Sequence, residues 1–423
     1  MMSRSLFFLL FALIFSGCAY AQKGEEIPII PPKQVTIDTL TYAHFEANQL
    51  YFASDSSKFA IFFEKMDSVI LNKQGNVSIL HLGASHVQGG TMSHRIRRNL
   101  LRSYPNHIAS RGIIFPYSAA RNCNNPGDYK VVRNTEFSLI RNVYKTIEKP
   151  LGMTGIAVYT QVPEAELTIK MNDSGLRFVT NRITLLGYPD NDTTEVQPTI
   201  VIRGKEYLPT EFSCVTRRYV YEVPAVTDSF KIKLNCYDSN TFVITGILLE
   251  NDDPGITFHS IGVNGANTGS YLKCVDFDED MELIRPDLVI FGIGINDAVP
   301  VNFDTTLFVK NYMKLVEKFR RLNPDCAFIF ITNNDSFRKN GKKSEANPNA
   351  ELVKRACYRL ADATGGAVWD QYTIMGGLGS MEKWRANGYA QNDRVHFTWK
   401  GYTLIGDLFF NAFVDGWRHF EKK

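Results

Sequence analysis

Nearly apolar segments alternate with amphipathic ones toward both ends of this 423-residue chain, and this alternation restricts the fold more than any other feature. Val77–Leu82, Asp287–Ile293 and Cys326–Ile331 are apolar over almost their whole length. A strand has this composition when both of its faces are buried, as in a parallel sheet that helices cover on both sides. We therefore expect an α/β fold with a doubly wound, mostly parallel sheet.

The segments around these strands have helical periodicity. Ser57–Leu71 places Phe59, Phe62 and Met66 at the spacing of one helix face. Further helices are predicted at 305–321, 350–363 and 402–413, and further strands at 256–263 and 367–369.

From about residue 131 to residue 252 the pattern changes to short alternating segments separated by turns. Strands are predicted at 155–160, 166–171, 200–203, 218–223, 230–234 and 242–248. Many short strands with frequent turns are typical of a β-sandwich. We predict an inserted β-sandwich module at 126–253 that divides one α/β domain into 46–125 and 254–423. Residues 112–130 are predicted to be mostly loop.

The first 21 residues predict a cleaved export signal. Arg4 supplies the positive start, Leu6–Phe15 the apolar core, and Ala19-Tyr20-Ala21 the small-residue cleavage site. The apolar run is too short to span a bilayer. The alternative is a lipoprotein signal that leaves Cys18 acylated. Either way we expect an exported protein, periplasmic or secreted, in which the polar, proline-bearing residues 22–45 form a linker.

Charge and cysteine spacing exclude several classes of partner. The net charge is +3, which argues against nucleic acid or an anionic membrane as the main partner. The six cysteines after the leader are not spaced as metal ligands, so neither a metal nor another cofactor is predicted. Cys214 and Cys236 could pair in an oxidising compartment, which the sequence leaves open.

A serine follows directly on the first buried strand. Gly83-Ala84-Ser85-His86 comes after Val77–Leu82, and a helical pattern begins at Thr91. The carboxyl end of a strand is where an open α/β sheet places its site, and a serine there has an exposed hydroxyl. Ser85 could equally serve only as a helix cap.

Three later stretches supply groups that a nucleophilic serine needs. Asp393 and His396 are three residues apart, so a carboxylate can orient one imidazole nitrogen and leave the other free as a base. Gly265 and Asn296 lie in loops that follow strands, and each can donate an N–H to an oxyanion. A tight turn at Gly265 and a helix cap at Asn296 are the structural alternatives.

Together these stretches resemble the SGNH or GDSL-type hydrolases, in order along the chain. Gly83-Ala84-Ser85-His86 is similar to the first family block, Gly265 to the second, Gly294-Ile295-Asn296-Asp297 to the third and Asp393-Arg394-Val395-His396 to the fifth. The resemblance implies a Ser85–His396–Asp393 triad. It also implies an oxyanion hole made by the amides of Ser85 and Gly265 and the Asn296 side chain.

The β-rich insertion between the first two blocks resembles the peptidoglycan O-acetylesterase branch, whose inserted module is similar to a carbohydrate-binding domain. This resemblance implies an exported serine esterase that removes acetyl or other acyl groups from a carbohydrate such as peptidoglycan. Tyr188, Tyr207, Tyr219 and Tyr221 could stack on sugar rings or belong to the core of the module.

One position departs from the family pattern and keeps alternatives open. Ala84 stands where the family usually has an aspartate before the serine. That aspartate is not a triad member, so its loss removes neither the nucleophile, the base nor an oxyanion donor. The alternatives are an O-acyltransferase with the same triad and a non-catalytic glycan-binding protein with a decayed site.

Overall fold

A computed structural model describes residues 40–103, 110–121, 123, 126–172, 176–190, 197–236 and 240–421. The predicted export signal, Cys18 and residues 22–39 of the predicted linker lie outside these residues. Residues 40–45 pack against the domain, since Leu40 is fully buried and the His44 amide donates to the Ile374 carbonyl at 2.8 Å.

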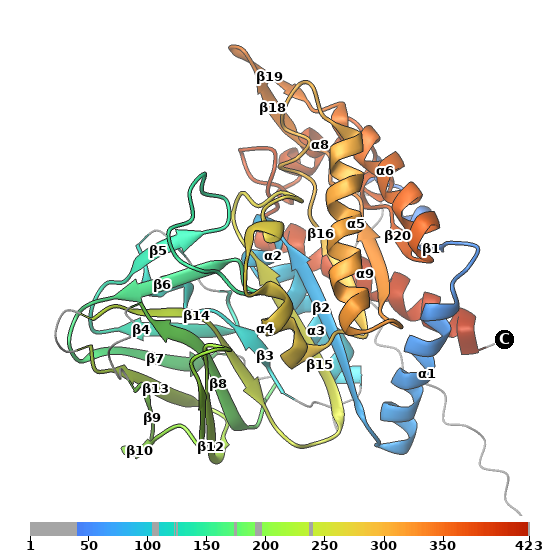
Figure 1. The fold of residues 1–423 in the computed structure, drawn as a ribbon. Helices are drawn as coiled ribbons and strands as arrows, with labels where there is room; N and C mark the ends of the chain where they lie inside the picture. Colours follow the sequence, from blue (N-terminus) through green and yellow to red (C-terminus); the bar gives the residue numbers. More distant parts are fainter. Residues whose placement is uncertain are drawn as a thin grey trace, which may run out of the picture.

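A six-stranded sheet forms the centre of the α/β part (Figure 1). Its order is β1 (Leu50–Phe52), β20 (Ala367–Trp369), β17 (Ala327–Ile331), β16 (Leu288–Gly292), β2 (Asn76–Gly83) and β15 (Gly255–Gly262). All neighbouring pairs are parallel except β1 with β20 at the edge. The predicted doubly wound α/β architecture is thus present, with one antiparallel edge strand.

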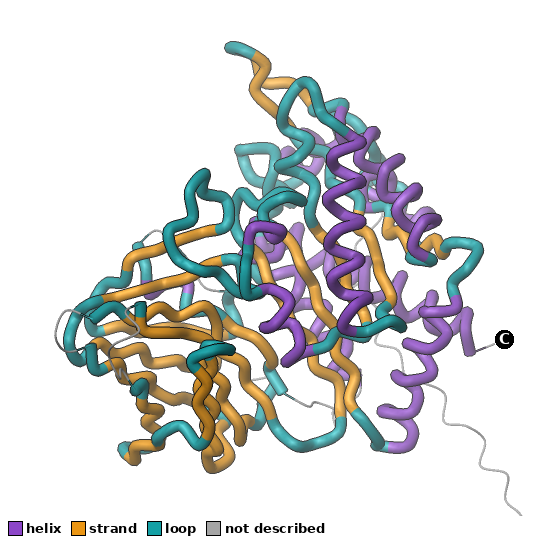
Figure 2. The backbone as a smooth tube through the Cα atoms, in the orientation of Figure 1, coloured by secondary structure: helices purple, strands orange, loops and turns teal. Residues whose placement is uncertain are grey.

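Two layers of helices bury the two faces of this sheet (Figure 2). Ile79, Ile290 and Ile329 point into one core. Leu80, Phe291 and Phe330 point into the other, because successive side chains of a strand alternate between faces. The first core is closed by α1 (Ser57–Asn72), α3 (Thr91–Ser103) and α9 (Trp399–Glu421), and the second by α4 (Phe277–Ile284), α5 (Thr305–Leu322) and α6 (Asn349–Thr364).

Between β2 and β15 the chain forms two antiparallel sheets, seen on the left of Figure 2. One has the order β10 (Lys205–Tyr207), β9 (Thr199–Ile202), β13 (Ser229–Leu234), β7 (Ala165–Met171) and β4 (Tyr129–Arg133). The other has the order β11 (Glu211–Ser213), β12 (Arg218–Val226), β8 (Thr180–Pro189), β14 (Phe242–Glu250), β6 (Ile156–Thr160) and β5 (Ser138–Arg141). Tyr188, Tyr219 and Tyr221 are buried in this region, so they serve its core rather than a sugar surface.

The prediction of loop for residues 112–130 was wrong at its two ends. β3 (Gly112–Ile114) pairs with β14, and β4 starts at Tyr129. A three-residue strand gives too little periodicity to detect, and its burial comes from a partner more than a hundred residues away. Because β3 precedes residue 126, the second antiparallel sheet draws on chain before the predicted start of the insertion.

Three shorter helices and one hairpin complete the part near the carboxyl ends of the strands. The helices are α2 (Ser85–Gln88), α7 (Gln371–Ile374) and α8 (Ser380–Ala386). The hairpin consists of β18 (Phe337–Asn340) and β19 (Lys343–Ala346) and projects at the top of Figure 1. No helix among the described residues has the length and apolar content to cross a bilayer.

Candidate active site

The carboxyl ends of three adjacent strands carry the predicted site residues. Ser85 follows β2, Gly265 follows β15, and Asn296 follows β16, and these strands are neighbours in the order β16–β2–β15. Segments far apart in the chain therefore meet at one edge of the sheet, as expected for a parallel α/β fold.

Ser85, His396 and Asp393 form a continuous hydrogen-bonded series. The Ser85 hydroxyl lies 2.8 Å from His396 Nε2, and His396 Nδ1 lies 2.7 Å from Asp393 Oδ2. All three residues retain solvent exposure, so a substrate can approach them. The structure thus brings the three predicted triad residues together.

The Asp393 carboxylate is fixed by its own loop. Its Oδ1 accepts the Val395 and His396 amides at 3.0 Å each, and Arg394 reverses the chain with φ +58°. Partial burial acts to raise the pKa of Asp393, but the hydrogen bonds from the His396 ring and the two amides outweigh it and lower that pKa. The carboxylate is therefore ionised and accepts Nδ1–H, which leaves the Nε2 lone pair free for the Ser85 proton.

The two further oxyanion donors sit in loops tied to their surroundings. Asn296 Nδ2 donates to the Ala266 carbonyl at 2.8 Å, and its amino group has a second hydrogen to offer. Gly265 is exposed and has φ +85°, a conformation that glycine adopts without strain. The Ser85 amide belongs to the first turn of α2, where amides have no partner within the helix.

Three residues that are not among the predicted site residues hold these loops. Gln88 on α2 accepts the Asn264 amide at 2.7 Å. Asp297 accepts both the amide and the hydroxyl of Thr268, at 3.1 and 2.6 Å. Asn334 donates to the Val395 carbonyl at 3.0 Å. Asp297 is the last residue of the Gly294–Asp297 motif and Gln88 lies three residues after Ser85, and these positions were the only sequence signal that the two residues offered.

Buried tyrosine hydroxyls cap the strand ends beneath the site. Tyr271 donates to the Gly83 carbonyl at 2.8 Å, Tyr117 to the Gly262 carbonyl at 2.9 Å and Tyr312 to the Ile293 carbonyl at 2.6 Å. A buried carbonyl without a partner costs about 1–3 kcal/mol, so each hydroxyl favours one path for the chain leaving its strand.

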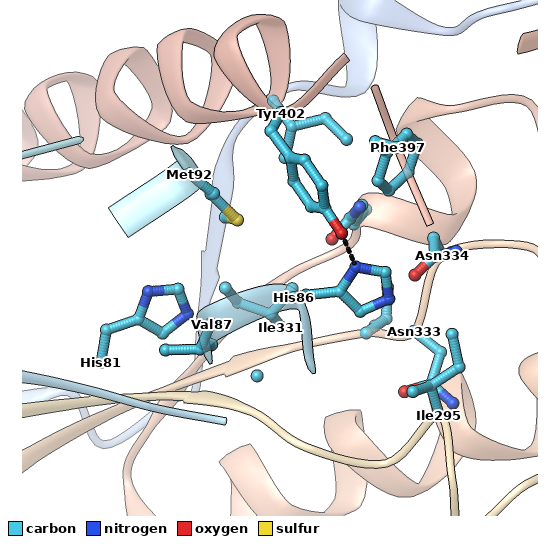
Figure 3. A pocket seen from close by; sticks show the side chains of 14 residues that line it. His81, His86, Val87, Met92, Ile295, Ile331, Asn333, Asn334, Phe397 and Tyr402 are labelled. Carbon is cyan, nitrogen blue, oxygen red and sulfur yellow. Dashed lines mark hydrogen bonds between the residues drawn. The ribbon is translucent and has the colours of Figure 1, made fainter. Parts of the chain in front are cut away.

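His86 adds a second imidazole beside the first, and the sequence revealed no partner for it. Its ring centroid lies 5.2 Å from that of His396, and its Nδ1 lies 2.7 Å from the Tyr402 hydroxyl (Figure 3). Burial, with a smaller contribution from His396, lowers the pKa of His86 to about 3, so this ring stays neutral.

A small cavity lies beneath α2 and is lined by His86, Asn333, Asn334, Gln371 and Tyr402, among others. It has about 30 Å³, room for one or two water molecules. His86 Nε2 is buried without a hydrogen-bond partner in the described part of the chain. Figure 3 shows the ring between Tyr402 on one side and Asn333 and Ile295 on the other. A water in this cavity would satisfy the ring.

Other potentially reactive side chains stay apart from this site. His81 and His259 are buried and bound to Ser93 and to the Ile113 amide, so they are structural. The described cysteines are free thiols, Cys214 and Cys236 included. No group of histidine, cysteine or acidic side chains within the described ranges could hold a metal ion.

Comparison with known proteins gives a family match and an extensive structural likeness. The model of the GDSL-like lipase/acylhydrolase family matches residues 234–404, a range that contains Gly265, Asn296, Asp393 and His396 but not Ser85. A solved structure of a peptidoglycan O-acetylesterase is 21% identical with a TM-score of 0.71, over 88% of this chain and 99% of the other. This likeness shows the fold.

Two partial likenesses add no argument because their TM-scores are low. A putative GDSL-like lipase from Parabacteroides merdae is 16% identical with a TM-score of 0.31, over 38% of this chain and 72% of its own. An acetyl xylan esterase is 20% identical with a TM-score of 0.30, over 37% of this chain and 81% of its own. No curated protein matches the chain.

Proposed function

Because this chain carries a GDSL-like lipase/acylhydrolase domain and is a carboxylic ester hydrolase, we propose that it removes O-acetyl groups from a carbohydrate. Ser85, His396 and Asp393 are its proposed triad. The observation that carries this proposal is the unbroken series from the Ser85 hydroxyl through both nitrogens of His396 to Asp393.

The proposed reaction follows from the protonation states of these groups. His396 Nε2 takes the Ser85 proton as the oxygen attacks the ester carbonyl, and Asp393 stabilises the imidazolium that forms. His396 then protonates the departing sugar oxygen, and a water activated by the same nitrogen releases acetate from Ser85.

The tetrahedral intermediate places a negative charge on the former carbonyl oxygen. The amides of Ser85 and Gly265 and the second Asn296 hydrogen are its proposed donors. They come from three loops held by Gln88, Asp297 and the tyrosine hydroxyls, so little rearrangement is needed when charge develops. Loss of one such donor costs about 2.7–4 kcal/mol of transition-state stabilisation.

A carbohydrate substrate and an exported location are the finer parts of the proposal. The predicted export signal supports a cell-wall or other extracellular polysaccharide, in the periplasm or outside the cell. The likeness to a peptidoglycan O-acetylesterase supports the same choice. Trp399, three residues beyond His396, is 73% exposed while Trp369, Trp384 and Trp417 are buried, and an exposed indole is a suitable surface for a sugar ring.

We further propose that the two antiparallel sheets constitute a β-sandwich module that contributes to glycan binding. They share one continuous hydrophobic core with the α5–α6 side of the α/β part. A module built onto the domain in this way can hold a polymer in a fixed relation to the site.

An acetate-release screen over acetylated polysaccharides tests this function. We expect the wild-type protein to release acetate, and Ser85→Ala to abolish release while its circular dichroism stays unchanged. Turnover by Ser85→Ala at the wild-type rate would remove Ser85 from the mechanism. Acetyl groups found on an added oligosaccharide, rather than as free acetate, would establish a transferase instead.

A further inference from the structure

The β18–β19 hairpin is anchored on the loop that carries His396. The Phe337 amide donates to the Arg394 carbonyl at 2.9 Å, and the Arg394 guanidinium lies over the Phe337 ring at 4.8 Å. At the foot of the hairpin, Asn334 donates to the Val395 carbonyl. From this base the hairpin projects away from the molecule, at the top of Figure 1.

The tip of the hairpin carries positive charge that the protein does not neutralise. Lys339, Lys342 and Lys343 are exposed, and none of them takes part in an ion pair within the described residues. The Arg338 guanidinium lies 3.1 Å from the carboxylate of Glu345, its neighbour on the other strand, so these two charges neutralise each other. Three ammonium groups therefore remain on the ten residues of the hairpin and its turn, Phe337–Ala346.

Acidic groups near the base are already engaged. Glu382 is shared by Arg385 at 2.5 Å and Arg394 at 3.6 Å, and Asp393 is bound to His396. Neither carboxylate is therefore free to compensate the lysines. The charge of the tip is available to a ligand, although the net charge of the whole chain is only +3.

Strand geometry places one cation on the face of the hairpin that meets the His396 loop. Lys339 lies two residues from Phe337 and so points to the same face as the ring under Arg394. At about 3.3 Å per residue, the turn at Gly341-Lys342 lies about 13 Å from Phe337. A ligand that contacts both the site and the tip must be long, as a polymer is.

We propose that this hairpin binds carboxylate groups of an acidic polysaccharide whose ester lies at Ser85. The inference rests on the proposed function and narrows its substrate to glycans with anionic groups some distance from the acetyl group. Several exposed ammonium–carboxylate contacts along one chain add up, and salt weakens them.

Charge reversal at the tip tests the proposal. The variant Lys339→Glu/Lys342→Glu/Lys343→Glu is compared with a control of equal charge change at three exposed lysines of the α/β part, Lys73→Glu/Lys310→Glu/Lys314→Glu. Substrates are partly O-acetylated polygalacturonate, neutral O-acetylated glucomannan and an aryl acetate. We expect the hairpin variant to raise KM for the acidic polymer at least tenfold at low salt, with kcat unchanged.

The same variant should leave KM for glucomannan and for the aryl acetate within twofold of wild type. The variant Lys339→Arg/Lys342→Arg/Lys343→Arg should keep the wild-type KM for the acidic polymer. At 0.5 M NaCl the KM values of the charge-reversed variant and the wild type should converge. An equal KM for hairpin variant, control and wild type on polygalacturonate at low salt would overturn the proposal.

A binding measurement separates this inference from the proposed function. We titrate two proteins with polygalacturonate and follow their fluorescence: Ser85→Ala, and Ser85→Ala with the three hairpin lysines changed to glutamate. The difference in affinity measures the contribution of the hairpin even if no ester is hydrolysed. Weaker binding by the reversed variant supports the proposal, and equal binding overturns it. Hairpin-dependent binding to vesicles of 30% phosphatidylglycerol, stronger than to the polymer, would identify a membrane surface and also overturn it.

Discussion

At the scale of single residues, the two oxygens of the Asp393 carboxylate have the separate partners that the proposed His396–Asp393 pair requires. One oxygen of the carboxylate holds the backbone of the loop, and the other holds the imidazole. The two tasks can be separated by substitution, because an amide keeps an oxygen for the backbone and loses the acceptor for Nδ1–H.

We expect Asp393→Asn to lower kcat toward an aryl acetate by about 10²–10⁴ with little change in stability. An amide NH₂ facing Nδ1 favours the tautomer with the proton on Nε2, which cannot accept the Ser85 proton. Steady-state kinetics measure the effect, and thermal unfolding controls for the fold. A rate within threefold of wild type would remove Asp393 from the proposed mechanism.

The motif residues could be predicted from sequence because each lies at a fixed offset from a recognisable strand end. Ser85, Gly265 and Asn296 follow strands, and Asp393 and His396 are close in the chain. His86 and Tyr402 could not be paired in this way, since 316 residues separate them and neither lies on a periodic pattern that points to the other. They meet only in the fold, where Tyr402 lies on α9, and α9 packs against α3, the helix that follows His86 and α2 in the chain.

At the scale of elements, α2 is seated directly on the ends of β2 and β15. A Cβ at Gly262 would overlap the Gln88 amide nitrogen and the Ala84 carbonyl oxygen, both of which are backbone atoms. Because backbone atoms cannot rotate away, the close approach of α2 depends on the absence of a side chain at this position. The position of Ser85 thus depends on a glycine in another strand.

We expect Gly262→Ala to displace α2 and lower kcat by more than tenfold, with a loss of about 1–3 kcal/mol in the free energy of unfolding. Gly127→Ala is the matched control, since no atom lies within 4 Å of its added Cβ. Kinetics and urea unfolding of both variants measure the effect. Equal activity of the two variants would show that α2 tolerates the shift.

The link between the loops after β15 and β16 predicts a pH effect on stability. Burial raises the pKa of Asp297 to about 6, against hydrogen bonds from Thr268 that lower it. A carboxyl whose pKa is raised on folding contributes stability at low pH, and this contribution is lost as pH rises through about 6. Asp297→Asn keeps one oxygen for Thr268 and removes the titration.

We therefore expect the wild-type protein to lose stability relative to Asp297→Asn between pH 4 and pH 7, by roughly 2 kcal/mol. Urea unfolding of both proteins at several pH values gives this difference directly. Other buried carboxyls such as Asp280 and Asp335 are present in both proteins and cancel. A difference that does not vary with pH would contradict the assigned environment of Asp297.

Helices with a repeated apolar stripe could be predicted from the sequence. Short strands that exist only because they pair with another strand could not. The helix predicted at 305–321 is observed as Thr305–Leu322, because its apolar stripe repeats over several turns. The last helix was predicted at 402–413 and runs from Trp399 to Glu421, longer at both ends. Strand β3 forms by pairing with the distant β14, and β10 forms by pairing with β9 across a short turn. Three-residue strands of this kind are too short to show a periodic pattern in the sequence.

At the scale of the whole molecule, a buried ionic cluster joins the α/β part to the antiparallel sheets. Asp128, just before β4, binds Arg111 at 2.6 Å and Arg97 of α3 at 3.2 Å. Arg97 also reaches the Phe258 carbonyl in β15. All three charged side chains are at most 2% exposed.

We expect Asp128→Asn to cost about 3–5 kcal/mol of stability at pH 7, because it removes the buried carboxylate that the guanidinium groups of Arg97 and Arg111 both contact. Glu222→Gln, which breaks an exposed ion pair with Arg182, is the control and should cost less than about 1 kcal/mol. Urea unfolding measures both. If Asp128→Asn lowers the free energy of unfolding no more than Glu222→Gln does, the cluster does not join the two parts.

The same cluster should weaken only in strong acid. Burial acts to raise the pKa of Asp128, but Arg111 and Arg97 outweigh it and hold this pKa well below its ordinary value. A depressed pKa contributes stability that is present above the ordinary carboxyl pKa and is lost as pH falls below it. The gap in stability between wild type and Asp128→Asn should therefore stay constant from pH 7 to pH 5 and shrink below pH 4.

The α/β class of the sheet that carries the site could be predicted because two kinds of periodicity occupy separate stretches of sequence. Helical repeats and apolar strands surround a segment with strand alternation, and this order specified an interruption between β2 and β15. How the two parts contact each other could not be predicted, since Arg97, Arg111 and Asp128 are ordinary charged residues in the sequence and pair only in the fold.

Covalent labelling of Ser85 is the sharpest test of whether this serine is the nucleophile and His396 its base. The wild-type protein is treated with a serine-directed phosphonate and the adduct is mapped by peptide mass spectrometry, with His396→Ala as the matched control. We expect one adduct, on Ser85, which forms at least a hundredfold more slowly when the imidazole is missing. An unlabelled Ser85, or an adduct that forms equally fast in both proteins, would contradict it.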